Sequence, residues 1–274
     1  MIRILAIGNS FSDDATRYLY PIAQAANVPM RLFNLSIGGC PLSKHYRMMK
    51  SGDEAYAFHF DSMNTGVTMS LQKALANDDW DIVTLQQVSH CAPRYDTYQP
   101  YLNEFAAFVR SYVPKARVYM HQTWAYEQGS ARLTQELGYR DQADMFADVK
   151  AAYEQAARDI HASGIIPSGE MMQRLIKNGF APVHRDTFHA HFGYGRYALA
   201  ALWFDLLTGC DVLQGGGAAG VAEVQAGVDI LGVVGNGLGL HTLFIVHAVD
   251  HDLAAGSHNM IQRLAHELAN EYRA

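Results

Sequence analysis

The chain has 274 residues, of which 49% are hydrophobic, and its 21 basic and 27 acidic side chains give a formal net charge of −6. This composition is typical of a folded protein with a substantial core, and it excludes an intrinsically disordered chain. Because the net charge is negative and the basic residues are scattered singly, we expect no binding to nucleic acid or to membranes.

Apolar runs alternate with helical patterns along most of the chain, which is typical of βαβ units and of a parallel sheet covered on both faces. The apolar runs predict strands over 2–7, 30–36, 81–85, 117–124 and 165–167. The helical patterns fall at 13–26, 67–76, 100–112, 141–163, 170–177 and 194–207. We therefore expect a single α/β domain over 1–274.

The predicted domain carries an insertion at about 41–66 and a glycine-rich C-terminal extension at about 211–274. The insertion contains four aromatic side chains, Tyr46, Tyr56, Phe58 and Phe60. We interpret it either as a lid or sugar-stacking wall over a site, or as a small hairpin packed on the domain. In the extension, the apolar spacing over 259–272 predicts a closing amphipathic helix, whereas 215–239 supports no assignment.

A serine stands where the first predicted strand meets the first predicted helix, in Gly8-Asn9-Ser10-Phe11-Ser12. A helix N-terminus has unpaired backbone N–H groups and a partial positive charge, which stabilise an alkoxide or an oxyanion. Ser10 is therefore a candidate nucleophile. The alternative is that Ser10 only caps the helix, which is the commoner use of serine at such a junction.

A base and a carboxylate that such a serine needs occur far downstream, in Arg185-Asp186-Thr187-Phe188-His189. Asp186 precedes His189 by three residues and can orient its ring. His191 is a second candidate base, but it lacks a carboxylate at the same offset. Ser10, His189 and Asp186 together suggest a hydrolase, although Asp186 can also be a loop cap.

Several of these polar segments are expected at one edge of the sheet, because ligands of open parallel sheets bind beyond the carboxyl ends of the strands. The segments are Ser10, the Gly38-Gly39 pair, Gln86-Gln87 and the Asp186 loop. The glycine pair can also be a plain tight turn. The glutamines can also do no more than bond backbone groups at a strand end.

Four separated blocks resemble, in order, the motifs of the SGNH (GDSL-like) hydrolases, and in detail a bacterial branch of the DUF4886 type. The blocks are Gly8-Asn9-Ser10-Phe11, Asn34-Leu35-Ser36-Ile37-Gly38-Gly39, Leu85-Gln86-Gln87 and Asp186-Thr187-Phe188-His189. The resemblance covers about 1–209. It implies a flavodoxin-like three-layer α/β/α fold with a five-stranded parallel sheet, and a triad of Ser10 as nucleophile, His189 as base and Asp186.

The resemblance also implies an oxyanion hole formed by the N–H groups of Ser10 and Gly39 and by a side-chain amide. The third block departs from the family's Gly-x-Asn-Asp, but a glutamine amide can donate the same hydrogen bond as asparagine. Gln86 is the first candidate because it is nearer the strand end, and Gln87 is the second. Asn9 is a further departure, since many members carry aspartate there.

The function that we expect is a serine esterase that uses no cofactor or metal and removes an ester group, in the first place an O-acetyl group from a carbohydrate. Its expected partner is a small-molecule ester. Two alternatives stay open. One is a catalytically silent SGNH-like protein that binds a small ligand; the other is a hydrolase whose metal is held by histidine pairs, His189 with His191 or His247 with His251.

The cysteines and the N-terminus predict a location but no assembly. Cys40, Cys91 and Cys210 are far apart, odd in number and in no CxxC pair, so we expect neither a disulfide framework nor a zinc ribbon. The short apolar N-terminal run continues directly into Gly8, which is not typical of a separate signal sequence. We therefore expect a reduced, cytoplasmic setting, and the sequence predicts no oligomeric state.

Overall fold

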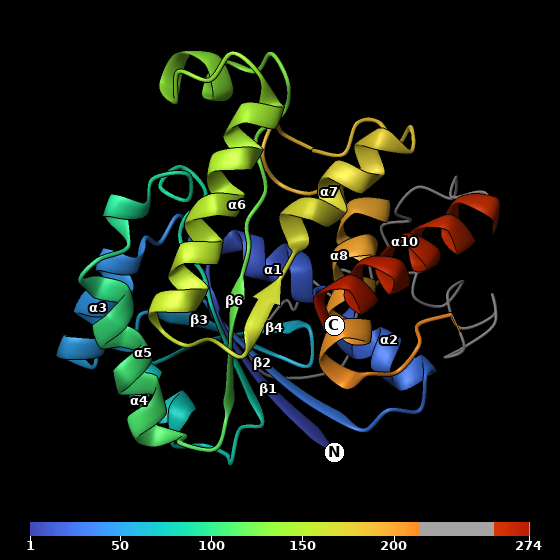
Figure 1. The fold of residues 1–274 in the computed structure, drawn as a ribbon. Helices are drawn as coiled ribbons and strands as arrows, with labels where there is room; N and C mark the ends of the chain where they lie inside the picture. Colours follow the sequence, from blue (N-terminus) through green and yellow to red (C-terminus); the bar gives the residue numbers. More distant parts are fainter. Residues whose placement is uncertain (214–254, 274) are drawn as a thin grey trace, which may run out of the picture.

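The centre of the molecule is a seven-stranded sheet in the order β4-β3-β2-β1-β5-β6-β7 (Figure 1). This computed structural model describes residues 1–213 and 255–273. The strands are β1 (Ile2–Gly8), β2 (Met30–Ser36), β3 (Tyr56–Phe60), β4 (Met63–Met69), β5 (Ile82–Leu85), β6 (Arg117–His121) and β7 (Gly164–Ile166). The predicted five-stranded parallel sheet is confirmed in β2, β1, β5, β6 and β7. The strand count is corrected to seven, because β3 and β4 add an antiparallel pair at the β2 edge.

The antiparallel pair comes from the insertion. β3 and β4 are joined by the two-residue turn Asp61-Ser62, whose φ angles of 48° and 69° are the left-handed values that tight hairpins require. The Asp61 carboxylate accepts a 2.9 Å hydrogen bond from the N–H of Leu32, which fastens the turn to β2. The prediction of a helix from residue 67 was wrong, because β4 continues to Met69 before the short helix α4 (Leu71–Leu75) begins.

Helices cover both faces of the sheet (Figure 1). One layer consists of α1 (Ser10–Thr16), α2 (Leu19–Ala25), α7 (Ser168–Lys177), α8 (Tyr194–Thr208) and α10 (Ala255–Arg273), with α8 in contact with the other four. The opposite layer consists of α3 (Leu42–Ser51), α4, α5 (Tyr101–Tyr112) and α6 (Gln142–Asp159). The short helices η1 (Tyr95–Thr97) and η2 (Arg132–Glu136) lie in connecting loops. The predicted three-layer α/β/α arrangement is thereby confirmed.

The helix expected over 13–26 is in fact the two short helices α1 and α2. A continuous helix would place Pro21 in its interior, where proline has no N–H for the carbonyl of Arg17. Because a new helix begins at Leu19, Pro21 lies in a first turn, where N–H groups have no helical partner in any case.

α8 is buried on nearly all sides, which explains why its sequence is apolar throughout rather than amphipathic. α10, which includes the predicted closing helix, packs its apolar stripe against α8. The buried carboxylate of Asp205 in α8 fastens this contact, since it accepts bonds of 2.7 Å from Arg273 and 2.8 Å from His266. No helix within the described residues is both long and apolar enough to cross a membrane.

The carboxyl ends of β1, β2, β5 and β6 lie at one edge of the sheet, where the strand-to-helix loops begin. The loop after β2 is tied directly to β1, because the N–H of Ile37 donates to the carbonyl of Gly8 at 3.2 Å. This edge is where the polar segments singled out in the sequence meet.

Candidate active site

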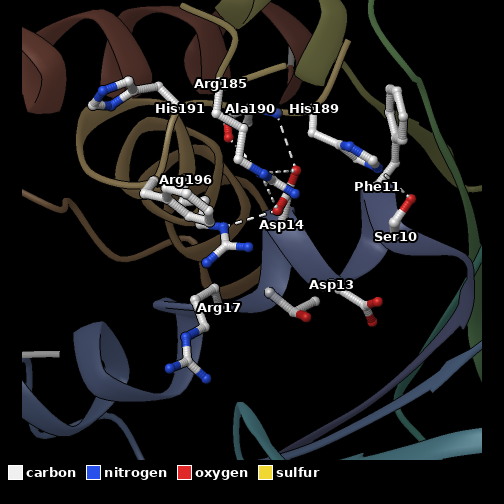
Figure 2. Close-up of polar contacts among 12 residues, drawn as sticks. Ser10, Phe11, Asp13, Asp14, Arg17, Arg185, His189, Ala190, His191 and Arg196 are labelled. Carbon is white, nitrogen blue, oxygen red and sulfur yellow. Dashed lines mark hydrogen bonds and ion pairs between the residues drawn. The ribbon is translucent and has the colours of Figure 1, made fainter. Parts of the chain in front are cut away.

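Ser10, His189 and Asp186 form a continuous chain of hydrogen bonds. His189 Nε2 lies 2.8 Å from Ser10 Oγ, and His189 Nδ1 lies 2.8 Å from Asp186 Oδ2. Figure 2 shows the His189 ring directed at the Ser10 hydroxyl across the gap between α1 and the loop before α8. Of the two candidate bases, the structure brings His189 to Ser10, whereas His191 stacks on Tyr194 at 4.2 Å.

The loop that carries Asp186 and His189 is tightly closed. Asp186 Oδ1 accepts the N–H of His189 at 2.9 Å, and the N–H of Arg185 donates to the His189 carbonyl at 3.0 Å. Between them, Thr187 has a φ of 76°, which is strained for a β-branched residue. Its carbonyl accepts the N–H of Glu127 at 2.7 Å, so the strained turn is held from outside the loop.

The Asp186 carboxylate stays ionised at neutral pH. Burial raises its pKa, but hydrogen bonds from the backbone and ring of His189 and the charges of His189 and Arg185 lower it further, so that the pKa lies below its usual value. An ionised carboxylate at this position accepts a hydrogen bond from His189 and stabilises a positive charge on the ring.

Ser10 is not the helix cap, which resolves the alternative left open by the sequence. Asn9 is the N-cap of α1, and its Oδ1 accepts the N–H of Phe11 at 3.0 Å. The Ser10 hydroxyl is therefore left for His189. Within residues 1–213 and 255–273, the backbone N–H of Ser10 makes no hydrogen bond.

Gln86 lies beneath the Ser10 loop and supports Asn9. Because the N–H of Phe11 can only donate, Asn9 Oδ1 is an acceptor, and Gln86 must donate to it through Nε2, at 2.8 Å. Gln86 Oε1 then faces His121 Nδ1 at 3.1 Å, so His121 donates from Nδ1. Complete burial keeps this ring neutral by lowering the pKa of His121 to about 3. We call His121, Gln86 and Asn9 the supporting chain.

The amide of Gln87 is already engaged in hydrogen bonds, so its predicted oxyanion role gains no support from the structure. Its Oε1 accepts the N–H groups of Leu42 and Val88, both at 2.9 Å. Its Nε2 donates to both oxygens of Thr97, at 3.1 Å each. Both amide hydrogens are thus used within the loop after β5, and Oε1 joins this loop to the start of α3.

The turn after β2 brings Gly39 to the same edge of the sheet. Gly39 has a φ of 60°, a conformation that favours glycine. The turn is tied to the Ser10 loop, because Asn9 Nδ2 donates to the carbonyl of Cys40 at 3.3 Å. Among the described residues, no partner accepts the N–H of Gly39.

Sequence reasoning missed a buried ion cluster formed by Asp14, Arg185 and Arg196, shown in Figure 2. The Asp14 carboxylate is fully buried and accepts bonds of 2.9 Å from Arg185 and 2.8 Å from Arg196. It also accepts the N–H of Ala190 at 3.0 Å. Asp14 lies one turn after Ser10 on α1, so the cluster joins the helix of the serine to both ends of the loop of His189. The feature of the sequence that could have indicated this cluster is an acidic residue, Asp14, on the apolar side of the first helix.

The metal alternative that pairs His189 with His191 finds no support in the structure. Both ring nitrogens of His189 are engaged, by Ser10 and by Asp186. His191 Nδ1 accepts the N–H of Gly193 at 3.3 Å. His247 and His251, like the segment 215–239, lie outside the described residues.

The fold and the hydrogen-bonded serine, histidine and aspartate define the class of protein: the SGNH (GDSL-like) hydrolase superfamily. A candidate SGNH hydrolase from Slackia heliotrinireducens is similar to this chain at 26% identity and a TM-score of 0.51, over 73% of this chain and 95% of its own. Within the class, the chain belongs to the DUF4886 family, because the family model "Domain of unknown function (DUF4886)" matches residues 3–220.

A solved DUF4886 protein from Bacteroides uniformis is 27% identical, with a TM-score of 0.78 over 97% of this chain and 93% of its own. A carbohydrate esterase family 3 protein from Talaromyces cellulolyticus shares the fold at 11% identity and a TM-score of 0.50, over 76% of this chain and 97% of its own. No curated protein matches the sequence.

Proposed function

We propose that the protein is a serine hydrolase that cleaves a carboxylic ester through Ser10, His189 and Asp186. The observation that carries this proposal is the position of His189, whose two ring nitrogens lie 2.8 Å from Ser10 Oγ and from Asp186 Oδ2. This is the distance at which a base takes a proton from a nucleophile while a carboxylate orients the base.

In the first half of the reaction, His189 Nε2 takes the proton of the Ser10 hydroxyl as Ser10 Oγ attacks the ester carbonyl carbon. The C–O bond to the alcohol then breaks, and His189 returns the proton to the alcohol oxygen. In the second half, water attacks the acyl-enzyme and His189 takes the proton from the water; the bond between the acyl carbon and Ser10 Oγ then breaks, and His189 returns the proton to Ser10 Oγ as the acid leaves. Asp186 stabilises the positive charge that His189 carries in both halves.

The oxyanion of each tetrahedral intermediate is bound, in this proposal, by the backbone N–H groups of Ser10 and Gly39. Support comes from the absence of other partners for these two groups among the described residues. Gln86 acts through Asn9 as a positioning residue, because its amide nitrogen already donates to Asn9 Oδ1.

For the substrate class we propose an O-acetyl ester of a carbohydrate. The likeness of the fold to the Talaromyces carbohydrate esterase supports this choice. The aromatic insertion does not, since Phe58 and Phe60 pack edge-on against Phe33, and Tyr56 is buried. These three side chains fit the other interpretation of the insertion, a hairpin packed on the domain.

The test is hydrolysis of p-nitrophenyl acetate and its longer-chain homologues by the wild type and by Ser10→Ala, with and without EDTA. We expect acetate to be cleaved fastest, EDTA to have no effect, and Ser10→Ala to lower kcat/KM by at least about a thousandfold. A Ser10→Ala variant that keeps its rate contradicts the triad, and loss of the wild-type rate in EDTA favours a metal hydrolase.

A further inference from the structure

An arginine lies two ring contacts from the catalytic base. Arg132, the first residue of η2, places its guanidinium carbon 4.1 Å from the centre of the Phe188 ring. The Phe188 ring centre lies in turn 3.9 Å from that of His189. The positive charge is therefore within about 8 Å of the His189 ring, which is inside the screening length at physiological salt.

Within the described part of the chain, the guanidinium of Arg132 forms neither an ion pair nor a side-chain hydrogen bond, although the charge of Glu136 acts on the same neighbours, His90 and Tyr126. Arg185 and Arg196 make a useful comparison, because both also stack on an aromatic ring, that of Phe192, yet both are paired with Asp14. Arg132 is held by stacking alone, which leaves the five N–H donors of its planar head group for a ligand.

The mechanism decides which part of a substrate lies near this charge. His189 has to protonate the alcohol oxygen, so the alcohol part of the ester lies beside the His189 ring. Phe188 contacts this ring, and Arg132 stacks on Phe188. Burial first, and then the charges of Arg94 and Arg132, lower the pKa of His90, while the nearby charge of Glu136 raises it by less.

We infer that Arg132 makes the site selective for esters whose alcohol part carries a carboxylate, such as esters of an acidic sugar or of a hydroxy acid. A guanidinium binds a carboxylate through two parallel N–H···O bonds. The single guanidinium of Arg132 can therefore bind one carboxylate of the substrate. The inference rests on the proposed function, because it assigns the alcohol side by the role of His189.

The kinetic test compares two acetate esters of similar shape, anionic 4-acetoxybenzoate and neutral 4-acetoxybenzamide. We expect Arg132→Gln to lower the ratio of kcat/KM for the benzoate to that for the benzamide by about tenfold, through KM, and to leave the benzamide rate within about twofold. Arg263→Gln, at an exposed arginine of α10, is the control and should leave the ratio unchanged. An unchanged ratio in Arg132→Gln, or an equal fall for both substrates, would overturn the inference.

A binding measurement separates this inference from the proposed function. The products 4-hydroxybenzoate and 4-hydroxybenzamide are titrated calorimetrically into the wild type, Ser10→Ala and Arg132→Gln. We expect the benzoate to bind more tightly than the benzamide to the first two proteins only, with an advantage that shrinks as salt is added. If the wild type hydrolyses neither ester but shows this pattern, the proposed hydrolysis fails and the anion site stands. Equal binding of the two products to the wild type would contradict the site even in an active esterase.

Discussion

At the scale of single residues, neighbouring side chains make the hydrogen bonds that position Ser10, so its own hydroxyl is not needed for a structural bond. Asn9 caps α1, Gln86 holds Asn9, and His121 fixes the orientation of the Gln86 amide. A neutral, fully buried histidine is a suitable end for such a chain, because its proton position is set by its single hydrogen-bond partner. The nucleophile is thus oriented from beneath the loop.

A substitution at Gly8 tests the packing of the Gln86 amide beneath the Ser10 loop. A Cβ added at Gly8 would lie 2.3 Å from Gln86 Oε1, whereas one added at Gly38 meets no atom within 4 Å. We expect Gly8→Ala to displace the Gln86 amide, to lower kcat at least tenfold and to lower the free energy of unfolding by about 1–3 kcal/mol. Gly38→Ala is the matched control and should change stability by less than about 0.5 kcal/mol. Steady-state kinetics and urea unfolding of both variants measure these effects. A fully active Gly8→Ala would show that the supporting chain is dispensable.

Gln86→Leu distinguishes a positioning residue from an oxyanion donor. Because the substitution leaves the buried His121 Nδ1–H without its acceptor, we expect the free energy of unfolding to fall by about 1–3 kcal/mol. We expect kcat to fall by no more than about a hundredfold, since the backbone donors stay in place. A larger fall in kcat with unchanged stability would instead support the role that the sequence predicted for Gln86, direct donation to the oxyanion.

At the scale of elements, the site exists because α1 and the loop before α8 are held in register by the Asp14 cluster. A buried carboxylate is tolerated there because two guanidinium groups and a backbone N–H share its charge. Removing the carboxylate leaves Arg196 partly buried without a counter-ion among the described residues, and leaves Arg185 only Asp186, at 3.9 Å.

We expect Asp14→Asn to lower the free energy of unfolding by about 3–5 kcal/mol and to lower kcat as the His189 loop separates from α1. Glu54→Gln removes the exposed ion pair with Lys73 and is the control, with an expected change below about 1 kcal/mol. Urea unfolding and kinetics of the two variants measure both effects. Equal stability of the two variants would contradict the proposal that the Asp14 cluster holds α1 and the His189 loop together.

Periodicity predicted most of the elements, and the short motifs predicted the residues of the triad, because both signals are local in the sequence. The hairpin of β3 and β4 was missed because an aromatic, polar segment has no clear period until its turn at Asp61-Ser62 is known. The Asp14 cluster joins residues separated by 171 and 182 positions. No pattern along the chain shows such a pairing.

At the scale of the whole molecule, several histidines are buried in a neutral form, which links stability to pH. Burial lowers the pKa of His45 and His121 to about 3 and that of His184 to about 4. Histidine in an unfolded chain titrates near pH 6.5, so below that value the unfolded state binds protons that the native state excludes. The contribution of these groups is therefore complete above pH 6.5 and is lost as the pH falls toward 4.

We expect the free energy of unfolding to fall by several kcal/mol between pH 7.5 and pH 5, as measured by urea unfolding followed by circular dichroism. His184→Gln can keep the hydrogen bond to the Ala125 carbonyl and should give a shallower dependence on pH. His161→Asn, at an exposed histidine, should leave the dependence unchanged. A midpoint that stays constant down to pH 5 would show that the native state takes up these protons.

The most direct test of the central claim is to treat the protein with a fluorophosphonate and to locate the adduct by peptide mass spectrometry. Because His189 activates one serine hydroxyl, the proposed mechanism predicts a single adduct on Ser10, formed in step with the loss of esterase activity. It also predicts that His189→Asn, which lacks the base, reacts far more slowly. An adduct on another serine, or an unmodified Ser10 in the inactivated protein, would contradict the assignment of Ser10 as the nucleophile.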